Sequence, residues 1–366
     1  MMVCGVLSAL LVLSLAESWD RARRTLLVFT ITATFLYFGH YIFFTRKMVN
    51  IPVTDTIYSF CNLAVFPLYL LYIEELTLRL PNRKKQILFM LPSIVCCLIV
   101  GILYTLMSKQ EVNDFIIHHL YNNEYSSLSG FAWWQGMAHL MAKIIFALQI
   151  PPVLILGIKH LRQYNQLIDN NYSNTEGKRL RPLQTLLTLL TITSIASFVS
   201  NIIGRSQFTE SIWLLAIPSF IFSLLLLFIG HVGLHLQFYI QDIEQDDAET
   251  TQSPLSDNEN NALLDKILKA VKDEKMFLQP NLKISDLAFH LGTNRNYVYE
   301  AIHTGLHISF TDFINEQRVR YADKLMAEEP DKPLGDIIIA SGFTSTSAFY
   351  RNYKKFKGCT PTKNRI

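Results

Sequence analysis

Long apolar runs alternate with short polar segments through the first two thirds of the 366-residue chain. Seven runs are apolar enough for membrane helices, and they cover roughly residues 1–16, 25–44, 52–73, 87–107, 131–158, 183–203 and 212–236. About 20 residues are needed to cross a bilayer as a helix, so the first run is short and the others are adequate. The pattern predicts an all-α protein that begins with a bundle of seven transmembrane helices.

The pattern changes after the last apolar run. Residues 237–261 contain the stretch QDIEQDDAETTQSPLSDNENN, which has seven acidic residues and no Lys or Arg. Such a composition is typical of a flexible linker. Short amphipathic segments follow in residues 262–366. We therefore expect a transmembrane region at 1–236, an acidic linker at 237–261 and a separate helical domain at 262–366.

Composition and cysteine usage narrow the functional classes. Half of the residues are hydrophobic and only 17% are charged, an imbalance that the apolar runs account for. The five cysteines form no CxxC pair and four lie in apolar runs, which indicates unpaired thiols rather than a zinc site or a disulfide framework. The sequence has no Gly-rich phosphate loop, HExxH or GxSxG motif. We expect no metal, no cofactor and no enzymatic activity.

The end of the chain has a helix-turn-helix pattern. PLGDIIIAS predicts a short apolar helix, Gly342 suits a turn that needs a positive φ, and Ser345 suits the N-cap of a second helix. Phe349 and Tyr353 are four residues apart and can face a core. In a helix-turn-helix the second helix enters the DNA major groove.

The same pattern occurs earlier in the domain. Asp286 and Gly292 are six residues apart, as are Asp336 and Gly342. Between the two patterns, SFTDFINEQRVRYADKLMAEE predicts one long helix with Ser309 as its N-cap. The spacing indicates two helix-turn-helix units joined by a long helix, an internal duplication.

Three segments carry a resemblance to a known family: KISDLAFHLGTNRNYVYEAI, ISFTDFINEQRVRYADKLM and GFTSTSAFYRNYKKFKGCTP. Together they resemble the DNA-binding domain of the AraC/XylS family of bacterial transcription regulators. The last is the most specific, because it combines a Gly-Phe turn, an aromatic and basic helix, a Gly and a closing Thr-Pro. The resemblance covers 262–366, under a third of the chain. It implies an all-helical domain whose two recognition helices enter successive major-groove segments.

The resemblance assigns DNA contacts by position. These are Asn294, Arg295, Asn296 and Glu300 on the first recognition helix, and Ser345, Thr346, Ser347, Tyr350 and Arg351 on the second. Lys354, Lys355 and Lys357 are expected to touch phosphates, which position the protein without specifying a sequence. The chain departs from the family pattern at Glu300, where a basic or polar residue is common, and at His307, where Gly is usual. Sixteen basic against twelve acidic residues in 262–366 is a modest excess for a DNA-binding domain.

Basic residues in the loops predict the orientation of the membrane region, because Lys and Arg favour the cytoplasmic side. The first, third and fifth loops hold twelve of them, and the second, fourth and sixth loops hold four. The N-terminus is thus expected outside a bacterial inner membrane, and the C-terminal domain in the cytoplasm. An alternative is that VLSALLVLSLAES is a signal-peptide core, in which case cleavage would leave six spans and an external DNA-binding domain.

Two pairs of ionisable residues in the membrane region raise the question of a ligand site or a metal site. His139 and Lys143 lie four apart on one face of the fifth span, where ionisable residues mark functional sites by default. They are a candidate site for an intramembrane signal, and the alternative is a Lys that faces a wet bundle interior. His118 and His119 lie in the fourth loop, but adjacent side chains point apart, so we expect a solvated loop rather than a metal site.

The sequence thus predicts a membrane-embedded, one-component transcription regulator. Its expected partners are promoter DNA, the lipid bilayer, a second copy in a homodimer, and an unidentified small-molecule or membrane signal. One alternative is a transporter or membrane enzyme whose DNA-binding tail reports its activity. Another is a structural anchor for a DNA-binding module. The acidic linker is either a simple tether or a decoy that competes with DNA for the basic face.

Overall fold

The computed structural model describes residues 2–15, 20–45, 50–78, 81–122, 124–203, 212–235 and 256–361. These residues are helical apart from turns and connections, and their only β interaction is an isolated bridge between Tyr172 and Lys283. The chain divides into two compact units. Unit 1 contains Met1–Arg162 and Leu180–Leu236, and unit 2 contains Gln163–Arg179 and Gln237–Ile366. The linker was predicted at 237–261; residues 237–255 lie outside the described residues, and the last part of the prediction was wrong, because α11 already begins at Asp257.

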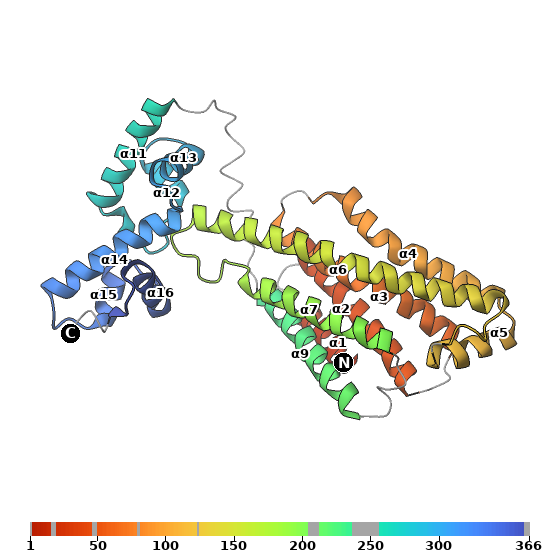
Figure 1. Cartoon of the computed structure of the whole chain (residues 1–366). Helices are drawn as coiled ribbons and strands as arrows, with labels where there is room; N and C mark the ends of the chain where they lie inside the picture. Colours follow the sequence, from red (N-terminus) through yellow and green to blue (C-terminus); the bar gives the residue numbers. More distant parts are fainter. Residues whose placement is uncertain are drawn as a thin grey trace. The chain divides into compact units, whose positions relative to one another are not determined.

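Each apolar run of the sequence corresponds to one helix (Figure 1). The long helices are α1 (Met2–Leu15), α2 (Arg21–Phe44), α3 (Ile51–Thr77), α4 (Arg83–Leu106), α6 (Gly130–Asn171), α7 (Arg181–Ile203) and α9 (Ile212–His235). A short helix α5 (Lys109–Asp114) and a π-helical segment η1 (Phe115–Tyr121) lie between α4 and α6. Among the described elements, α6 is the one that contributes to both units.

The core of unit 1 forms around α3, which packs against α2 and α4. Leu63, Tyr69, Leu70, Tyr72 and Ile73 of α3 are fully buried. In contrast, many large apolar side chains of the neighbouring helices are exposed, including Ile87, Leu88, Leu98 and Ile102 of α4, each more than half exposed. Large exposed apolar surfaces are rare on soluble monomers and mark interaction or membrane surfaces.

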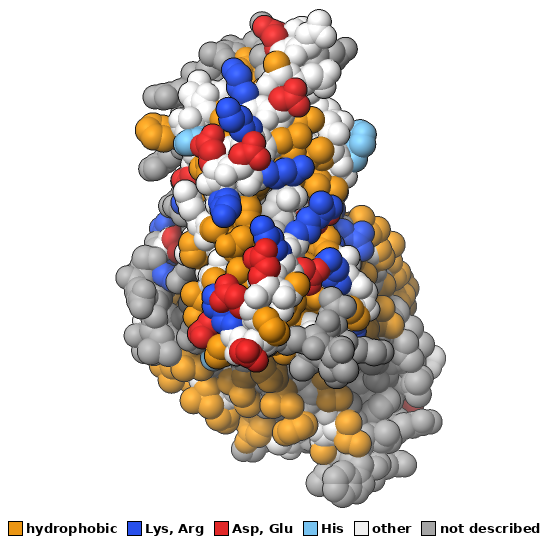
Figure 2. All heavy atoms as spheres, turned by 90° about the vertical axis from the view of Figure 1, so that its left-hand side faces the viewer, with side chains coloured by type: hydrophobic (Ala, Val, Ile, Leu, Met, Phe, Trp, Pro, Cys, Tyr) orange, Lys and Arg blue, Asp and Glu red, His pale blue; other side chains and the backbone are white. Residues whose placement is uncertain are grey.

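Among the described residues, four helices are long and apolar enough to cross a membrane, namely α2, α3, α4 and α6, and shorter apolar helices cover Met2–Leu13 and Ser219–Val232. Figure 2 shows the contrast in surface chemistry between the units: hydrophobic side chains dominate the visible surface of unit 1, whereas Lys, Arg, Asp and Glu intermingle on unit 2. The described residues therefore support a region of apolar helices joined to a polar domain. The count of seven spans and their orientation stay predictions.

Unit 2 is built from short helices around one longer helix. They are α11 (Asp257–Lys272), the 3-10 turn η2 (Met276–Leu278), α12 (Ile284–His290), α13 (Arg295–Leu306), α14 (Phe310–Glu328), α15 (Leu334–Ala340) and α16 (Thr346–Lys357). Helix α14 joins two cores. Its first half packs with α11, α12 and α13 through Phe310, Phe313 and Ile314. Its second half packs with α15 and α16 through Val319 and Ala322.

The two helix pairs, α12–α13 and α15–α16, each turn at a glycine with a positive φ, +61° at Gly292 and +80° at Gly342. The left-handed backbone region favours glycine because it has no Cβ. Ser309 begins α14 as predicted, since its hydroxyl accepts a hydrogen bond from the Asp312 backbone N–H. His307, where the family usually has Gly, ends α13 with a φ of 55°. Position 307 therefore has a left-handed backbone conformation, which is the conformation that the family's usual Gly adopts without strain.

Candidate DNA-binding interface

The second predicted recognition helix is α16, and local sequence determines its orientation. The Oγ of Ser345 accepts a hydrogen bond of 3.0 Å from the Ala348 backbone N–H, which caps the helix. Phe349 and Tyr353 are fully buried in the second core, so the opposite face is presented to solvent. The exposed side chains on that face are Thr346, Ser347, Arg351, Lys354 and Lys355, and Tyr350 is half-buried. This is the face that the sequence assigned to DNA.

Acidic side chains of unit 2 pair with the basic residues of α16. Lys355 Nζ lies 2.6 Å from Asp312 Oδ1, Lys357 pairs with Asp323, and Arg351 Nη2 lies 3.7 Å from Glu176 Oε1. Ion pairs between exposed side chains contribute little to stability, commonly about 0–1 kcal/mol. The basic groups can therefore exchange these carboxylates for phosphates at low cost.

The first predicted recognition helix is α13. Asn294 is its N-cap, and the Asn294 side-chain oxygen accepts a 2.8 Å hydrogen bond from the Asn296 backbone N–H. Arg295 is half-buried, while Asn296 and Glu300 are exposed. Asn294 therefore caps the helix. Among the predicted contacts of α13, the side chains of Asn296 and Glu300 are the more accessible.

The sequence did not single out Tyr299, which lies on the same helix. Its ring is exposed and stacks on His303 with 5.4 Å between centroids. An exposed aromatic residue on a predicted recognition helix, one position before Glu300, was the available signal. Aromatic side chains can make apolar contacts with bases, so Tyr299 belongs with the candidate contacts of α13.

Arg318 of α14 holds the two halves of unit 2 together. The side chain is 1% exposed and donates to the carbonyl oxygens of Phe277 at 2.7 Å, Gln279 at 2.6 Å and Pro280 at 3.2 Å. Its guanidinium carbon lies 5.8 Å from the ring centre of Phe343, which belongs to the second core. Burial lowers the pKa of Arg318 to about 10, so the group stays charged at neutral pH.

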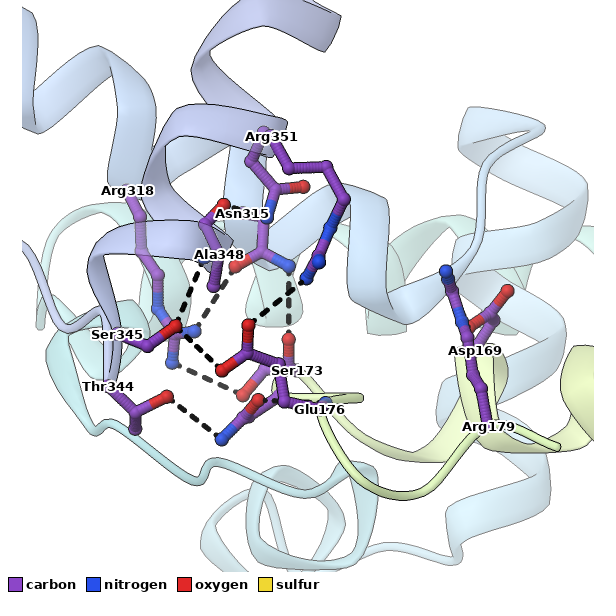
Figure 3. A network of polar contacts seen from close by, with 12 residues as sticks. Asp169, Ser173, Glu176, Arg179, Asn315, Arg318, Thr344, Ser345, Ala348 and Arg351 are labelled. Carbon is purple, nitrogen blue, oxygen red and sulfur yellow. Dashed lines mark hydrogen bonds and ion pairs between the residues drawn. The ribbon is translucent and has the colours of Figure 1, made fainter. Parts of the chain in front are cut away.

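Residues of the α6–α7 connection contribute to the same unit, next to α16 (Figure 3). Ser345 Oγ donates a 2.6 Å hydrogen bond to Glu176 Oε2, the same carboxylate that faces Arg351. Asn174 Nδ2 donates to Thr344 Oγ1 at 2.9 Å. Two predicted DNA-contact residues, Ser345 and Arg351, are thus brought together on one carboxylate from outside the helix-turn-helix sequence.

In unit 1 the candidate signal residue His139 belongs to a buried polar cluster. Its Nε2 lies 2.9 Å from Asp55 Oδ2, and its Nδ1 lies 2.9 Å from the carbonyl oxygen of Gln135. The Tyr104 hydroxyl donates to the same Asp55 oxygen at 2.7 Å. Two protonation states satisfy these contacts: an imidazolium beside an ionised Asp55, and a neutral imidazole that accepts a hydrogen bond from a protonated Asp55. Lys143, one turn further along α6, is half-buried.

Asp55 also lines a cavity of about 40 Å³ between α2, α3 and η1. The other lining residues are largely aromatic or apolar and include His40, Phe43, Tyr58 and Tyr121. Asp55 and Tyr104 were missing from the sequence-predicted site. They lie 84 and 35 positions from His139, so no spacing rule connects the three.

The expectation of a solvated loop between α4 and α6 was wrong for His119. The segment contains α5 and η1, and His119 of η1 is buried against the Tyr125 ring, 4.5 Å away between centroids. His118 lies 3.4 Å from a Glu124 oxygen. Within the described residues, no group of three or more His, Cys, Asp or Glu side chains is arranged to hold a metal ion. All five cysteines are free thiols.

Comparisons with known proteins bear on the C-terminal part of the chain. A family model described as a helix-turn-helix domain, of the AraC type, matches residues 287–365. An HTH-type transcriptional regulator of Staphylococcus aureus is 28% identical over 116 residues, which cover 32% of this chain and 14% of that protein. The melibiose operon regulatory protein of Escherichia coli is 30% identical over 84 residues, 23% of this chain and 28% of that protein. No solved structure matches.

The similarities to these relatives cover only part of each protein. The chain spans well under a third of the length of these relatives, and the matches cover at most about a third of the chain. The residues that the family model matches run from Leu287, within α12, through α16, in the region where the sequence predicted two helix-turn-helix units. The C-terminus therefore carries an AraC-type helix-turn-helix domain, which resembles those of transcription regulators.

Proposed function

We propose that this protein is a membrane-embedded, one-component transcription regulator. The observation that carries the proposal is the presence, in one chain, of an AraC-type helix-turn-helix domain and of four helices long and apolar enough to cross a membrane. In this proposal seven helices cross the bacterial inner membrane, the N-terminus is outside, and the C-terminal domain binds promoter DNA in the cytoplasm. A homodimer would raise the effective concentration of the second DNA-binding domain.

The two predicted recognition helices would read adjacent segments of the major groove. On α16, Arg351 is suited to guanine at a specific site and to a phosphate in non-specific binding, and Lys354 and Lys355 are suited to phosphates. On α13, Asn296 is suited to adenine. The support for this assignment is that the side chains of α16 lie opposite its buried Phe349, on the face left free by the core.

Signal reception is proposed for the cluster of Asp55, Tyr104 and His139. A histidine, a carboxyl group and a tyrosine hydroxyl buried among apolar helices are costly to build, and ionisable groups in such positions commonly have functional roles. Lys143 follows on the same helix and extends the candidate site. The signal would act by changing the arrangement of these groups and, through the helices, the state of the DNA-binding domain.

Chromatin crosslinking in intact cells tests the proposal. The full-length protein is expected to crosslink to a few promoter regions, and Arg351→Ala should lose these peaks because it removes a candidate base contact. A matched control is Arg320→Ala, since Arg320 is an exposed arginine of α14 that pairs with Glu316 one turn earlier. Promoter peaks that persist in Arg351→Ala, or that disappear equally in Arg320→Ala, would contradict the assigned interface.

A second candidate function is a transporter or membrane enzyme whose tail reports its activity, and the buried Asp55–His139 pair is the observation that favours it. Asp55→Asn, which keeps the shape of the side chain and removes its charge, separates the two candidates. A sensor should lose signal-dependent regulation while accumulation of small solutes in cells is unchanged. A transporter should show altered solute accumulation even in a variant that lacks residues 256–366.

A further inference from the structure

The connection between α6 and α7 inserts into the helix-turn-helix domain. Residues Tyr172 and Ser173 are 4% and 2% exposed. The Ser173 backbone N–H donates to the Leu282 carbonyl at 3.0 Å, and the Ser173 carbonyl accepts from Asn315 Nδ2 at 3.0 Å. Arg318 Nη2 donates to Ser173 Oγ at 3.2 Å. These contacts anchor the connection to α14 and to the segment before α12.

A second set of contacts follows a few residues later and reaches α16 (Figure 3). Asn174 contacts Thr344 in the turn before α16, and its Oδ1 also accepts a hydrogen bond from the Glu176 backbone N–H at 3.1 Å. That local turn directs the Glu176 carboxylate to the N-terminus of α16. The Glu176 side chain is 31% exposed, in contrast to the buried anchor at Tyr172 and Ser173.

The partners of Glu176 are the groups that a DNA phosphate would use. A helix N-terminus attracts anions because its first N–H groups are unpaired within the helix and its dipole is positive there. Ser345 adds a hydroxyl donor at that end, and Arg351, on the next turns of the exposed face, adds a guanidinium. A carboxylate and a phosphate present the same chemistry to these donors, an anion with several acceptor oxygens.

We infer that the α6–α7 connection occupies part of the DNA-binding surface and competes with the DNA backbone for Ser345 and Arg351, with Glu176 as the phosphate substitute. The inference rests on the proposed function, because it presumes that α16 binds DNA. It also identifies a physical link between the two units that does not depend on the linker at 237–255. Helix α6 carries His139 and leads directly into the connection, so a change in α6 or α7 can withdraw Glu176 from α16.

The contacts between Glu176 and its partners are weak enough for a DNA phosphate to replace the carboxylate. Glu176 and Arg351 are partly exposed, so their ion pair is screened by water and salt. The anchor at Ser173 has buried partners and can persist while Glu176 moves. Release of α16 therefore requires only a local displacement of residues 174–176, and the connection itself stays attached to the domain.

The test compares DNA affinities of full-length variants in detergent micelles. The probe is a fluorescein-labelled 30-base-pair duplex of random sequence at low salt, because competition with phosphates does not depend on base sequence. Glu176→Gln keeps the shape of the side chain and removes its charge. The matched control is Glu328→Gln, which removes the same charge from an exposed residue of α14 that pairs with Lys324.

We expect Glu176→Gln to bind the duplex about fivefold more tightly than the wild type. A fivefold change in affinity is at the low end of the coupling that is typical between two binding sites. Glu328→Gln should change affinity less than twofold. Affinity of Glu176→Gln should also fall more steeply with salt, because Arg351 no longer has to leave a carboxylate to reach a phosphate. In an Arg351→Ala background, Glu176→Gln should raise affinity less than it does in the wild type, because one of the two groups that the carboxylate blocks is gone.

Two other outcomes have distinct meanings. If Glu176→Gln and Glu328→Gln bind equally, or if Glu176→Gln raises affinity as much in the Arg351→Ala background as in the wild type, the competition is absent, although the wild type can still be a DNA-binding regulator. If neither the wild type nor Glu176→Gln binds the duplex at low salt, the proposed function itself fails, and the inference fails with it.

Discussion

Gly292 and Gly342 occupy the same turn in the two helix-turn-helix units, but alanine should affect them differently. Both have a positive φ, which costs an L-residue about 1–2 kcal/mol. A Gly→Ala change also restricts the unfolded chain, which offsets about 0.4–1 kcal/mol of that cost. A Cβ at Gly292 meets nothing within 4 Å. We therefore expect Gly292→Ala to destabilise unit 2 by about 1 kcal/mol.

A Cβ at Gly342 meets backbone atoms of Leu278, the carbonyl oxygen at 2.8 Å and the carbonyl carbon and Cα at 3.0 Å. Backbone atoms cannot rotate away as a side chain can. Relief requires the α15–α16 turn to separate from η2, and overpacking of this kind costs about 1–3 kcal/mol. Gly342→Ala should thus destabilise unit 2 by about 3 kcal/mol in total, and it should change the spacing of the two recognition helices.

Hydrogen exchange in the full-length protein measures the difference. Since about 1.4 kcal/mol corresponds to a factor of ten, peptides from α15 and α16 should exchange on the order of 100-fold faster in Gly342→Ala and on the order of fivefold faster in Gly292→Ala at its own turn. Equal effects of the two substitutions would refute the argument that the close approach to Leu278, rather than the positive φ, decides the cost.

Three further substitutions test the framework of unit 2. Arg318→Met leaves the carbonyl oxygens that accept from Arg318 without a donor. It should lower the free energy of unfolding by about 3–5 kcal/mol, measured as lower thermal stability of the domain. His307→Gly relieves a positive φ and should stabilise the end of α13 by about 1 kcal/mol, seen as slower hydrogen exchange. Hydrogen bonds from Ser256 lower the pKa of Glu259 below 4.5, so its stabilisation of α11 is complete above that pH and is lost as pH falls through the lower folded pKa. Glu259→Gln should remove this acid dependence of α11 protection.

Local patterns predicted much of unit 2. The four-residue spacing of Phe349 and Tyr353 identified two fully buried residues, and the turn chemistry identified the positive φ at Gly342. Periodicity and turn preference act within a few residues, so they can be read from one chain. The apolar runs likewise predicted helices, but hydropathy alone does not determine how many of them cross a membrane.

The contacts at the candidate sites that the sequence missed join distant residues. Asp55 and His139 meet across 84 positions, and Ser345 and Glu176 across 169. The connection after α6 is polar and lies between two apolar runs, a composition that predicts only a solvated loop. Its insertion depends on donors such as Arg318 and Asn315, which are buried but carry no pattern that distinguishes them from surface residues. Such contacts follow from tertiary packing and not from periodicity.

The position of Ser173 also determines how the DNA-binding activity can be isolated. A fragment that begins at residue 256 includes α11 to α16, but it lacks the two Ser173 oxygens that accept from Asn315 and Arg318 in the full chain. The same truncation removes Glu176. Loss of the anchor lowers the stability of the domain, while loss of Glu176 exposes Ser345 and Arg351, and the two effects change DNA affinity in opposite directions. A fragment with wild-type affinity is therefore compatible with strong competition from Glu176. Only a substitution such as Glu176→Gln, which keeps the anchor at Ser173, separates the inhibitory charge from the structural role of the connection.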